Sequence, residues 1–287
     1  MSILSAIWAQ TALAGPTESR ITFLSDGQEV VATLSVPNGD PAPTVLLFHG
    51  FTGDRDELKT DHVPEGVFAR AARALAESGY ASLRIDFRGS GESLSDLSFA
   101  DTTFEGQVND GLAAIGYLQG LDAVDGSNIH IIGWSQGGLV ASAVAGRSSA
   151  PKAVALWNAV ADPTQTFGAI LGTDKIAEGI AADADQEIPV ALPWGAEIKL
   201  NGAFFDGLES FDPPAELAAY VGPVMVAQGS LDTAVDPATA QLFVDAHKGE
   251  TTFWDAEMDH VFNVFGSDET LDQLITETIA FFQSANG

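Results

Sequence analysis

The sequence predicts an α/β fold, in which helices cover both faces of a mostly parallel central sheet. Two observations support this prediction. First, short and continuous apolar runs recur along the chain, such as Val45–Phe48, Ile129–Trp134 and Val224–Gln228. Runs of this kind are typical of strands that are buried on both faces. Second, segments with helical spacing of apolar residues alternate with these runs, which is the pattern of βαβ crossovers.

The expected elements follow in chain order. The segments Arg20–Ser25 and Glu29–Val36 flank an Asp-Gly turn and predict a hairpin. Further strands are expected at Val45–Phe48, Ala81–Phe87, Ile129–Trp134, Ala153–Trp157, Val224–Gln228 and Thr251–Trp254. Helices are expected at Val63–Ser78, Glu105–Gln119, Gln136–Ala145, Pro214–Tyr220, Pro237–His247 and Glu269–Ser284.

The alternation of strands and helices stops after Ala161 and returns near position 212. Residues 162–211 contain Gly, Pro, Trp and Phe in short pieces that form no clean βα unit. We therefore interpret 162–211 as an inserted lid subdomain, and 20–161 with 212–287 as the core. Residues 1–19 are interpreted as an N-terminal extension. A signal peptide is less favoured because no Lys or Arg precedes the short apolar stretch.

Composition limits the classes of function. The chain has 287 residues, of which 46% are hydrophobic, enough for one large core. Lys and Arg total 12 against 40 Asp and Glu, a net charge of -28, which argues against binding to nucleic acid or to anionic membranes. The acidity fits either a surface that resists self-association or adaptation to salt. The absence of cysteine excludes disulfides and a Cys nucleophile.

The strongest motif is Gly133-Trp134-Ser135-Gln136-Gly137, which fits G-x-S-x-G. It lies between a predicted buried strand and a predicted helix. In that context the motif forms a nucleophile elbow, a strained turn that exposes the serine hydroxyl above the sheet. Ser135 is therefore the expected nucleophile.

A serine hydroxyl needs a base, and chains with this elbow present serine, acid and histidine in that order. His260 follows the last predicted strand by a short loop, so it is the expected base. The other histidines have structural interpretations: His49 orients the loop after its strand, His62 lies in a loop, His130 belongs to the core, and His247 is solvated or caps a helix.

The acid that orients the imidazole should follow the strand Val224–Gln228. Asp232 lies there and is the expected acid. Asp236 is the main rival, although Pro237 after it favours a helix N-cap. Asp259 is a weaker candidate because the side chains of consecutive residues diverge.

The oxyanion formed by attack needs preorganised N–H donors. The backbone N–H of Gln136, directly after the nucleophile, is one. The loop His49–Gly53 follows a strand expected beside the elbow strand, and Phe51 N–H is assigned as the second donor. This chemistry implies neither a cofactor nor a metal.

Five motifs resemble those of α/β-hydrolases and fall in the same order. They are His49–Gly53, Asp86–Gly91, Gly133–Gly138, Gly229–Asp232 and Asp259-His260. More narrowly, residues 20–285 resemble bacterial feruloyl (cinnamoyl) esterases, as do Leu200–Asp206 and Tyr220–Val224. The resemblance implies the α/β-hydrolase fold, a small lid that shapes an aromatic acyl pocket, the triad Ser135, Asp232 and His260, and oxyanion donors Phe51 and Gln136. Trp134 departs from the family, which often has His before the serine.

These features predict hydrolysis of carboxylic esters through an acyl-enzyme, with hydroxycinnamate esters as candidate substrates. A short-chain carboxylesterase and a peptidase for small substrates are the alternatives. A non-catalytic binding module is disfavoured because every part of the triad is present. The expected partner is a small-molecule ester, and a homodimer is left open. The cytoplasm is favoured as the compartment, and secretion is left open.

Overall fold

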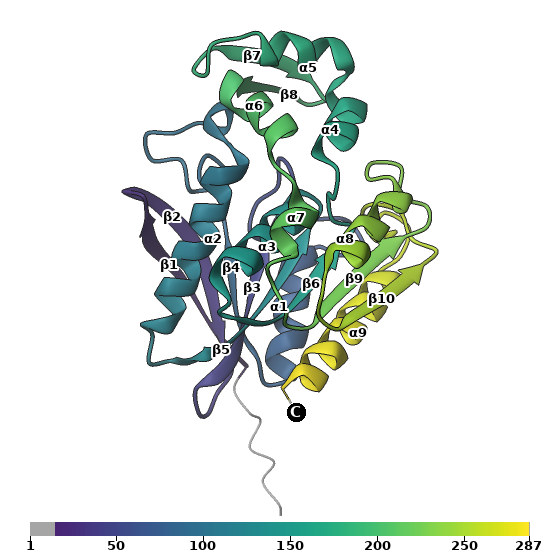
Figure 1. Ribbon diagram of the computed structural model, residues 1–287. Coiled ribbons are helices and arrows are strands. Elements are labelled where there is room, and N and C mark those ends of the chain that lie inside the picture. Colours follow the sequence, from purple (N-terminus) through teal and green to yellow (C-terminus); the bar gives the residue numbers. More distant parts are fainter. Residues whose placement is uncertain (1–14, 287) are drawn as a thin grey trace, which may run out of the picture.

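Residues 15–286, which the computed structural model describes, are built around an eight-stranded sheet with the order β1-β2-β4-β3-β5-β6-β9-β10 (Figure 1). The strands are β1 (Thr17–Ser25), β2 (Gln28–Val36), β3 (Ala42–Phe48), β4 (Ala81–Ile85), β5 (Val124–Trp134), β6 (Pro151–Trp157), β9 (Val224–Gly229) and β10 (Thr251–Ala256). Strand β2 is antiparallel to both of its neighbours, and every other neighbouring pair is parallel. The prediction of a mostly parallel sheet is confirmed.

Helices cover both faces of this sheet. They are α1 (Val67–Glu77), α2 (Phe104–Gln119), α3 (Gln136–Ser148), α7 (Pro213–Leu217), α8 (Ala240–Ala246) and α9 (Glu269–Ala285). Apolar residues of α2, α3, α7 and α8 join one core cluster, and those of α1 and α9 join the other. The sheet therefore separates two cores, as the continuous apolar runs predicted.

Strand β3 illustrates why these runs are continuous. Leu46 and Phe48 point into the core under α2 and α3, whereas Val45 and Leu47 point into the core under α1 and α9. All four side chains are fully buried. Because successive side chains of a strand alternate between faces, each residue of β3 meets a core. Each such burial contributes about 1.5–3 kcal/mol.

The predicted hairpin at the start of the fold is confirmed. Asp26 and Gly27 have φ angles of 50° and 83°, the left-handed values that a tight two-residue hairpin turn requires. Strand β1 begins at Thr17, so residues 17–19 belong to the strand and not to the expected N-terminal extension. Residues 1–14 of that extension lie outside the described residues.

Several predicted helices differ from the structure at their ends: α7 ends at Leu217 instead of Tyr220, and α3 continues to Ser148 instead of ending at Ala145. Helix α1 begins at Val67 instead of Val63, because Gly66 has a φ of 101° and cannot continue a helix. The predicted helix Pro237–His247 is a 3₁₀ turn, η2 (Pro237–Thr239), followed by α8. Asp236 caps η2 by accepting from Ala238 N–H at 3.0 Å, as its position before a proline predicted.

The interpretation of His247 as a solvated side chain is wrong. His247 is buried, and its Nδ1 lies 2.7 Å from the Thr251 hydroxyl. Its ring stacks on the ring of Tyr220, which follows α7 in the chain. Its backbone does form the C-cap of α8, so the capping alternative is correct.

The segment 162–211 forms a separate group of elements beyond the sheet, seen at the top of Figure 1. They are α4 (Pro163–Leu171), α5 (Thr173–Ile180), β7 (Glu187–Ala191), β8 (Glu197–Asn201) and α6 (Gly202–Ser210), with β7 and β8 paired antiparallel. The 3₁₀ turn η1 (Phe99–Asp101) of the core packs against β8. That this segment acts as a lid stays a prediction.

Between residues 15 and 286, no helix is both long and apolar enough to span a bilayer.

A buried histidine gives this fold a specific response to acid. His130 lies in β5, with its ring centroid 4.6 Å from that of Phe282 and 5.7 Å from that of Tyr80. Burial lowers the pKa of His130 to about 4, from an ordinary value near 6.5. The folded state therefore favours the neutral imidazole. The stability that this confers is present above pH 6.5 and is lost as the pH falls towards 4.

We expect the variant His130→Phe to lose less stability on acidification than the wild type. Between pH 7 and pH 4.5 the wild type should lose about 2–3 kcal/mol more of its unfolding free energy than the variant. Urea denaturation at both pH values measures this difference. The variant His62→Gln, at an exposed loop position, is the control. Parallel losses in wild type and His130→Phe would contradict the assignment.

Candidate active site

Ser135 lies in the sharp turn between β5 and α3. Its φ of 56° and ψ of -119° are rare for a residue with a side chain, and such strain persists only where the surroundings enforce it. Ser135 N–H donates to the carbonyl of Trp157 at 3.0 Å, and its own carbonyl accepts from Val160 N–H at 3.0 Å. Both bonds tie the turn to the end of β6.

Two glycines of the motif allow this turn to pack closely. A Cβ at Gly137 would overlap the carbonyl oxygens of Phe48 and His49, at the end of β3. A Cβ at Gly133 would overlap the backbone of Gly137. The first turn of α3 therefore lies directly against the end of β3, and this packing brings Ser135 next to the loop that follows β3.

The structure brings together the three side chains expected to form the triad. The Ser135 Oγ lies 3.0 Å from His260 Nε2, and His260 Nδ1 lies 2.8 Å from Asp232 Oδ2. Ser135 and Asp232 are buried, whereas the His260 side chain keeps 18% of its surface exposed. A hydroxyl, an imidazole and a carboxylate thus form a continuous hydrogen-bonded line that reaches solvent.

The three candidate acids have distinct partners. Asp232 uses its second oxygen, Oδ1, to accept from Ala234 N–H at 2.8 Å and Val235 N–H at 2.9 Å, which fixes the carboxylate while Oδ2 faces His260. Asp236 caps η2. Asp259 Oδ1 accepts from backbone N–H groups of its own loop, at Val261 and Asn263. Of the three, Asp232 contacts the imidazole.

Asn158, which the sequence did not single out, holds the histidine loop. Its Nδ2 donates to the carbonyls of Asp259 at 3.1 Å and His260 at 3.0 Å, and its Oδ1 accepts from Gly229 N–H at 2.8 Å. Asn158 is fully buried and has a φ of 42°, a left-handed value that asparagine tolerates better than most residues. The sequence signal that could have indicated this role of Asn158 is its position directly after a predicted buried strand.

Trp134, the departure from the feruloyl esterase pattern, also supports this loop. Its indole N–H donates to the His260 carbonyl at 3.1 Å, and its ring centroid lies 5.5 Å from that of the imidazole. The side chain before the nucleophile therefore packs against the expected base.

The two expected oxyanion donors, the N–H groups of Phe51 and Gln136, have no acceptor among residues 15–286. Gln136 begins α3, where helix N–H groups point outward and the dipole favours negative charge. Its side chain is fixed by a hydrogen bond to Gln107 at 2.6 Å. Both donors are thus available to a ligand.

His49 fixes the peptide group that carries Phe51 N–H. Its Nε2 accepts from Phe87 N–H at 3.1 Å, so its ring proton lies on Nδ1, 2.8 Å from the Gly50 carbonyl. Burial lowers the pKa of His49 and keeps it neutral. Because a trans peptide is planar, holding the Gly50 oxygen on one side aims the Phe51 N–H to the opposite side. The expected orienting role of His49 agrees with these contacts.

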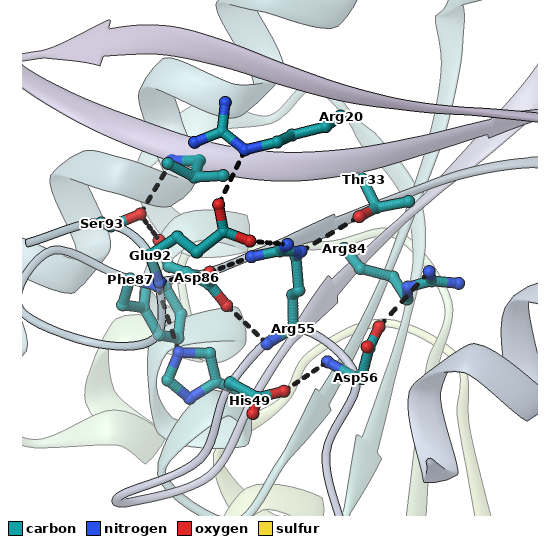
Figure 2. A network of polar contacts seen from close by, with 12 residues as sticks. Arg20, Thr33, His49, Arg55, Asp56, Arg84, Asp86, Phe87, Glu92 and Ser93 are labelled. Atoms are coloured by element: carbon teal, nitrogen blue, oxygen red, sulfur yellow. Dashed lines mark hydrogen bonds and ion pairs between the residues drawn. The ribbon is translucent and has the colours of Figure 1, made fainter. Parts of the chain in front are cut away.

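An ion-pair network next to His49 holds the same loop (Figure 2). The Arg55 N–H donates to Asp86 Oδ1 at 2.7 Å, and its guanidinium donates to Asp86 Oδ2 and to Glu92. Arg55 also donates to Thr33 on β2 at 3.0 Å. Asp86 is buried, and the Arg55 side chain is largely so. The network joins the loops after β3 and β4, and explains part of the Asp86–Gly91 motif.

Aromatic rings surround the Phe51 side chain. Its ring centroid lies 5.5 Å from Phe99 of η1, 5.2 Å from Phe167 of α4 and 5.7 Å from Phe204 of α6. The segment 162–211 thus contacts the loop after β3 through aromatic side chains. A cavity of about 840 Å³ lies between η1 and the β7–β8 hairpin, and its lining includes none of Ser135, Asp232 and His260. Among residues 15–286, no cluster of three or more His, Cys, Asp or Glu side chains has the arrangement of a metal site.

Comparison with known proteins identifies the fold. A family model described as alpha/beta hydrolase fold matches residues 43–173, from β3 to the start of α5. Two curated proteins of Escherichia coli, described as "Uncharacterized 31.7 kDa protein in traX-finO intergenic region", are 30% identical over 116 residues. That match covers 40% of this chain and 36% of theirs, so the chain spans about a third of the length of these relatives.

Solved structures match over nearly the whole chain. Est1E from Butyrivibrio proteoclasticus, solved with ferulic acid bound, has a TM-score of 0.71 at 22% identity, covering 92% of this chain and 98% of that one. The esterase domain of a Rhodothermus marinus protein has a TM-score of 0.68 at 24% identity, covering 92% and 97%. DcsB with a substrate analogue has a TM-score of 0.76 at 15% identity, covering 94% and 99%.

The protein therefore has the α/β-hydrolase fold, as the sequence predicted. The resemblance to feruloyl esterases is confirmed at the level of the fold.

We expect Asn158→Ala to weaken both the fold and the site. Removing the side chain leaves Gly229 N–H without its acceptor, at a cost of about 1–3 kcal/mol for a buried group, and takes one of two donors from each of the Asp259 and His260 carbonyls. Thermal denaturation should show a lower Tm. Any ester hydrolysis should fall about tenfold, since the His260 carbonyl keeps only the hydrogen bond from Trp134 and the histidine loop is held less firmly. The control is Asn109→Ala, which removes one exposed hydrogen bond to Asp26. Equal activity in the two variants would argue against a role for Asn158.

Proposed function

We propose that this protein is a serine hydrolase that cleaves carboxylic esters through an acyl-enzyme at Ser135. The observation that supports the proposal best is the hydrogen-bonded line from Ser135 Oγ to His260 Nε2, at 3.0 Å, and from His260 Nδ1 to Asp232 Oδ2, at 2.8 Å. A hydroxyl within hydrogen-bond distance of an oriented imidazole is the arrangement that activates a serine.

In the first half of the reaction, Ser135 Oγ attacks the ester carbonyl carbon while His260 Nε2 accepts its proton. The carboxylate of Asp232 stabilises the imidazolium that forms. The carbonyl oxygen gains negative charge and is bound by the N–H groups of Phe51 and Gln136. His260 then donates its proton to the leaving alcohol as the ester C–O bond breaks, which leaves Ser135 acylated.

In the second half, water replaces the alcohol. His260 accepts a proton from the water as its oxygen attacks the acyl carbon, and the same two N–H groups bind the second oxyanion. The bond to Ser135 then breaks and the proton returns to Oγ. The carboxylic acid leaves and the free enzyme is restored.

An ester of a hydroxycinnamic acid is the substrate class that we propose. Phe51 carries the oxyanion N–H on its backbone and an aromatic ring on its side chain, so an acyl group bound at that N–H lies near the ring. The half-buried ring of Phe99 extends this aromatic surface, and the buried rings of Phe167 and Phe204 pack against Phe51 and support it. Est1E, of the same fold, was solved with ferulic acid bound. We further propose that 162–211 acts as the lid that shapes this acyl site.

Replacing Ser135 tests the mechanism. We expect Ser135→Ala to lower kcat for p-nitrophenyl butyrate by more than about 10⁴-fold, because the nucleophile is lost. The matched control is Ser142→Ala on α3, the helix that follows the elbow; its hydroxyl donates to the Leu139 carbonyl and should be dispensable for turnover. Full turnover by Ser135→Ala would refute the mechanism.

Replacing Phe51 tests the substrate class. Phe51→Leu keeps the backbone N–H but removes the ring, so we expect kcat/KM for methyl ferulate to fall about tenfold, the value of one good apolar contact. For p-nitrophenyl acetate, kcat/KM should change less than about threefold. The control is Phe253→Leu, at an exposed position on β10. Equal losses on both esters, or hydrolysis of a peptide amide in preference to methyl ferulate, would exclude an aromatic acyl site.

A further inference from the structure

A buried carboxyl group contacts the loop that carries the oxyanion donor. Glu57 is 6% exposed, and its Oε1 accepts from Gly50 N–H at 2.5 Å. Gly50 is also adjacent to the nucleophile, since a Cβ added there would lie 3.5 Å from the Cβ of Ser135. Glu57 is thus linked to the elbow through one residue.

The loop is shaped around this carboxyl group. Gly53 N–H donates to the Gly50 carbonyl at 3.1 Å, which closes a turn over Phe51 and Thr52. A Cβ at Gly53 would overlap the Glu57 carboxyl oxygens. The glycine therefore leaves the space that the carboxyl group fills beneath the turn.

Glu57 is itself held in an unusual conformation. Its φ of 59° is in the left-handed region, and its N–H donates to the Asp54 carbonyl at 3.1 Å. The preceding carbonyl, of Asp56, accepts from Phe68 N–H in the first turn of α1 at 2.9 Å. Glu57 thus connects the loop to a helix that is packed in the core, and backbone strain of this kind needs such support.

The charges around Glu57 are negative. Asp54 and Asp86 face it, and no Lys or Arg side chain in the part of the chain that the structure describes contacts its carboxyl group. Burial, and then these two carboxylates, raise the pKa of Glu57 well above its usual range, although N–H groups of Gly50 and Leu58 act in the other direction. A neutral acid here can still accept from Gly50 N–H.

We propose that Glu57 is a positioning residue for oxyanion stabilisation: by binding Gly50 N–H, its carboxyl group fixes the orientation of Phe51 N–H beside Ser135. This inference rests on the proposed function. Gly50 N–H belongs to the peptide group before Gly50, and Gly50 C=O to the peptide group that carries Phe51 N–H. Glu57 holds the first and His49 holds the second, at 2.5 Å and 2.8 Å. Together, these two hydrogen bonds fix the φ and ψ angles of Gly50. Glycine has more backbone freedom than any other residue, so Gly50 needs both.

The test compares Glu57→Ala, Glu57→Gln and Asp110→Asn. Asp110 is a matched control because it is also a buried carboxylate, but it pairs with Arg88, 2.7 Å away. For each variant we would measure kcat and KM with p-nitrophenyl butyrate, the inhibition constant of a trifluoromethyl ketone that forms an oxyanion on a serine, and the Tm. All kinetics would be recorded well below the lowest Tm.

If the proposal is correct, Glu57→Ala lowers kcat on the order of 10²-fold, as the loss of an oxyanion donor does, with KM changed less than about threefold. Its affinity for the ketone should fall by a similar factor. Glu57→Gln should keep kcat within about tenfold of wild type, because its amide oxygen can accept from Gly50 N–H. Asp110→Asn should lower the Tm without lowering kcat.

Three outcomes would overturn the proposal. One is a kcat for Glu57→Ala equal to that of Asp110→Asn, which would leave Glu57 a purely structural role. Another is a loss in Glu57→Ala that lies in KM and leaves binding of the ketone unchanged. The third is that the wild type hydrolyses no ester, or that Ser135→Ala is as active as the wild type. That last outcome would reject the proposed function as well, whereas the first two would reject only the role of Glu57.

Discussion

The close contact between the first turn of α3 and the end of β3 is the constraint on which the site depends. It exists because Gly137 has no side chain, and a Cβ there would overlap the carbonyls of Phe48 and His49. The contact brings Ser135 and the start of α3 next to Gly50, in the loop after β3. A larger residue at 137 would push the helix away and separate the hydroxyl from the N–H groups around it.

The loops at this edge of the sheet are held by buried polar side chains. Loop backbone has no partner strand, so its polar groups need other partners, and each buried group left without one costs about 1–3 kcal/mol. Asn158, His49 and Glu57 supply these hydrogen bonds, each to a different loop backbone group. The buried pair of Arg55 and Asp86 has the same function between two loops. The chain has 12 Lys and Arg residues against 40 Asp and Glu, so the Arg55 guanidinium changes the net charge little. Its role here is to hold the two loops together.

The central sheet was predictable because its signal is local. An apolar run such as Val45–Phe48 reports burial on both faces whatever its neighbours are, and G-x-S-x-G between a strand and a helix reports an elbow. The start of α1 was not predictable from apolar spacing alone, since Gly66 breaks the helix inside an apolar pattern. The segment 162–211 was harder still. Its short elements are stabilised by ring contacts with distant residues such as Phe51, which no local pattern encodes.

The sequence by itself determined the chemistry that is available: a serine in an elbow, a histidine after the last strand and three aspartates near them. It determined these because residue type and order along the chain are local properties. Only the tertiary structure decided which aspartate contacts the imidazole, and that an asparagine and a buried glutamate hold the surrounding loops. Those contacts join residues far apart in the chain, such as Ser135 and His260, 125 positions apart, and they exist only once the sheet has aligned its strand ends.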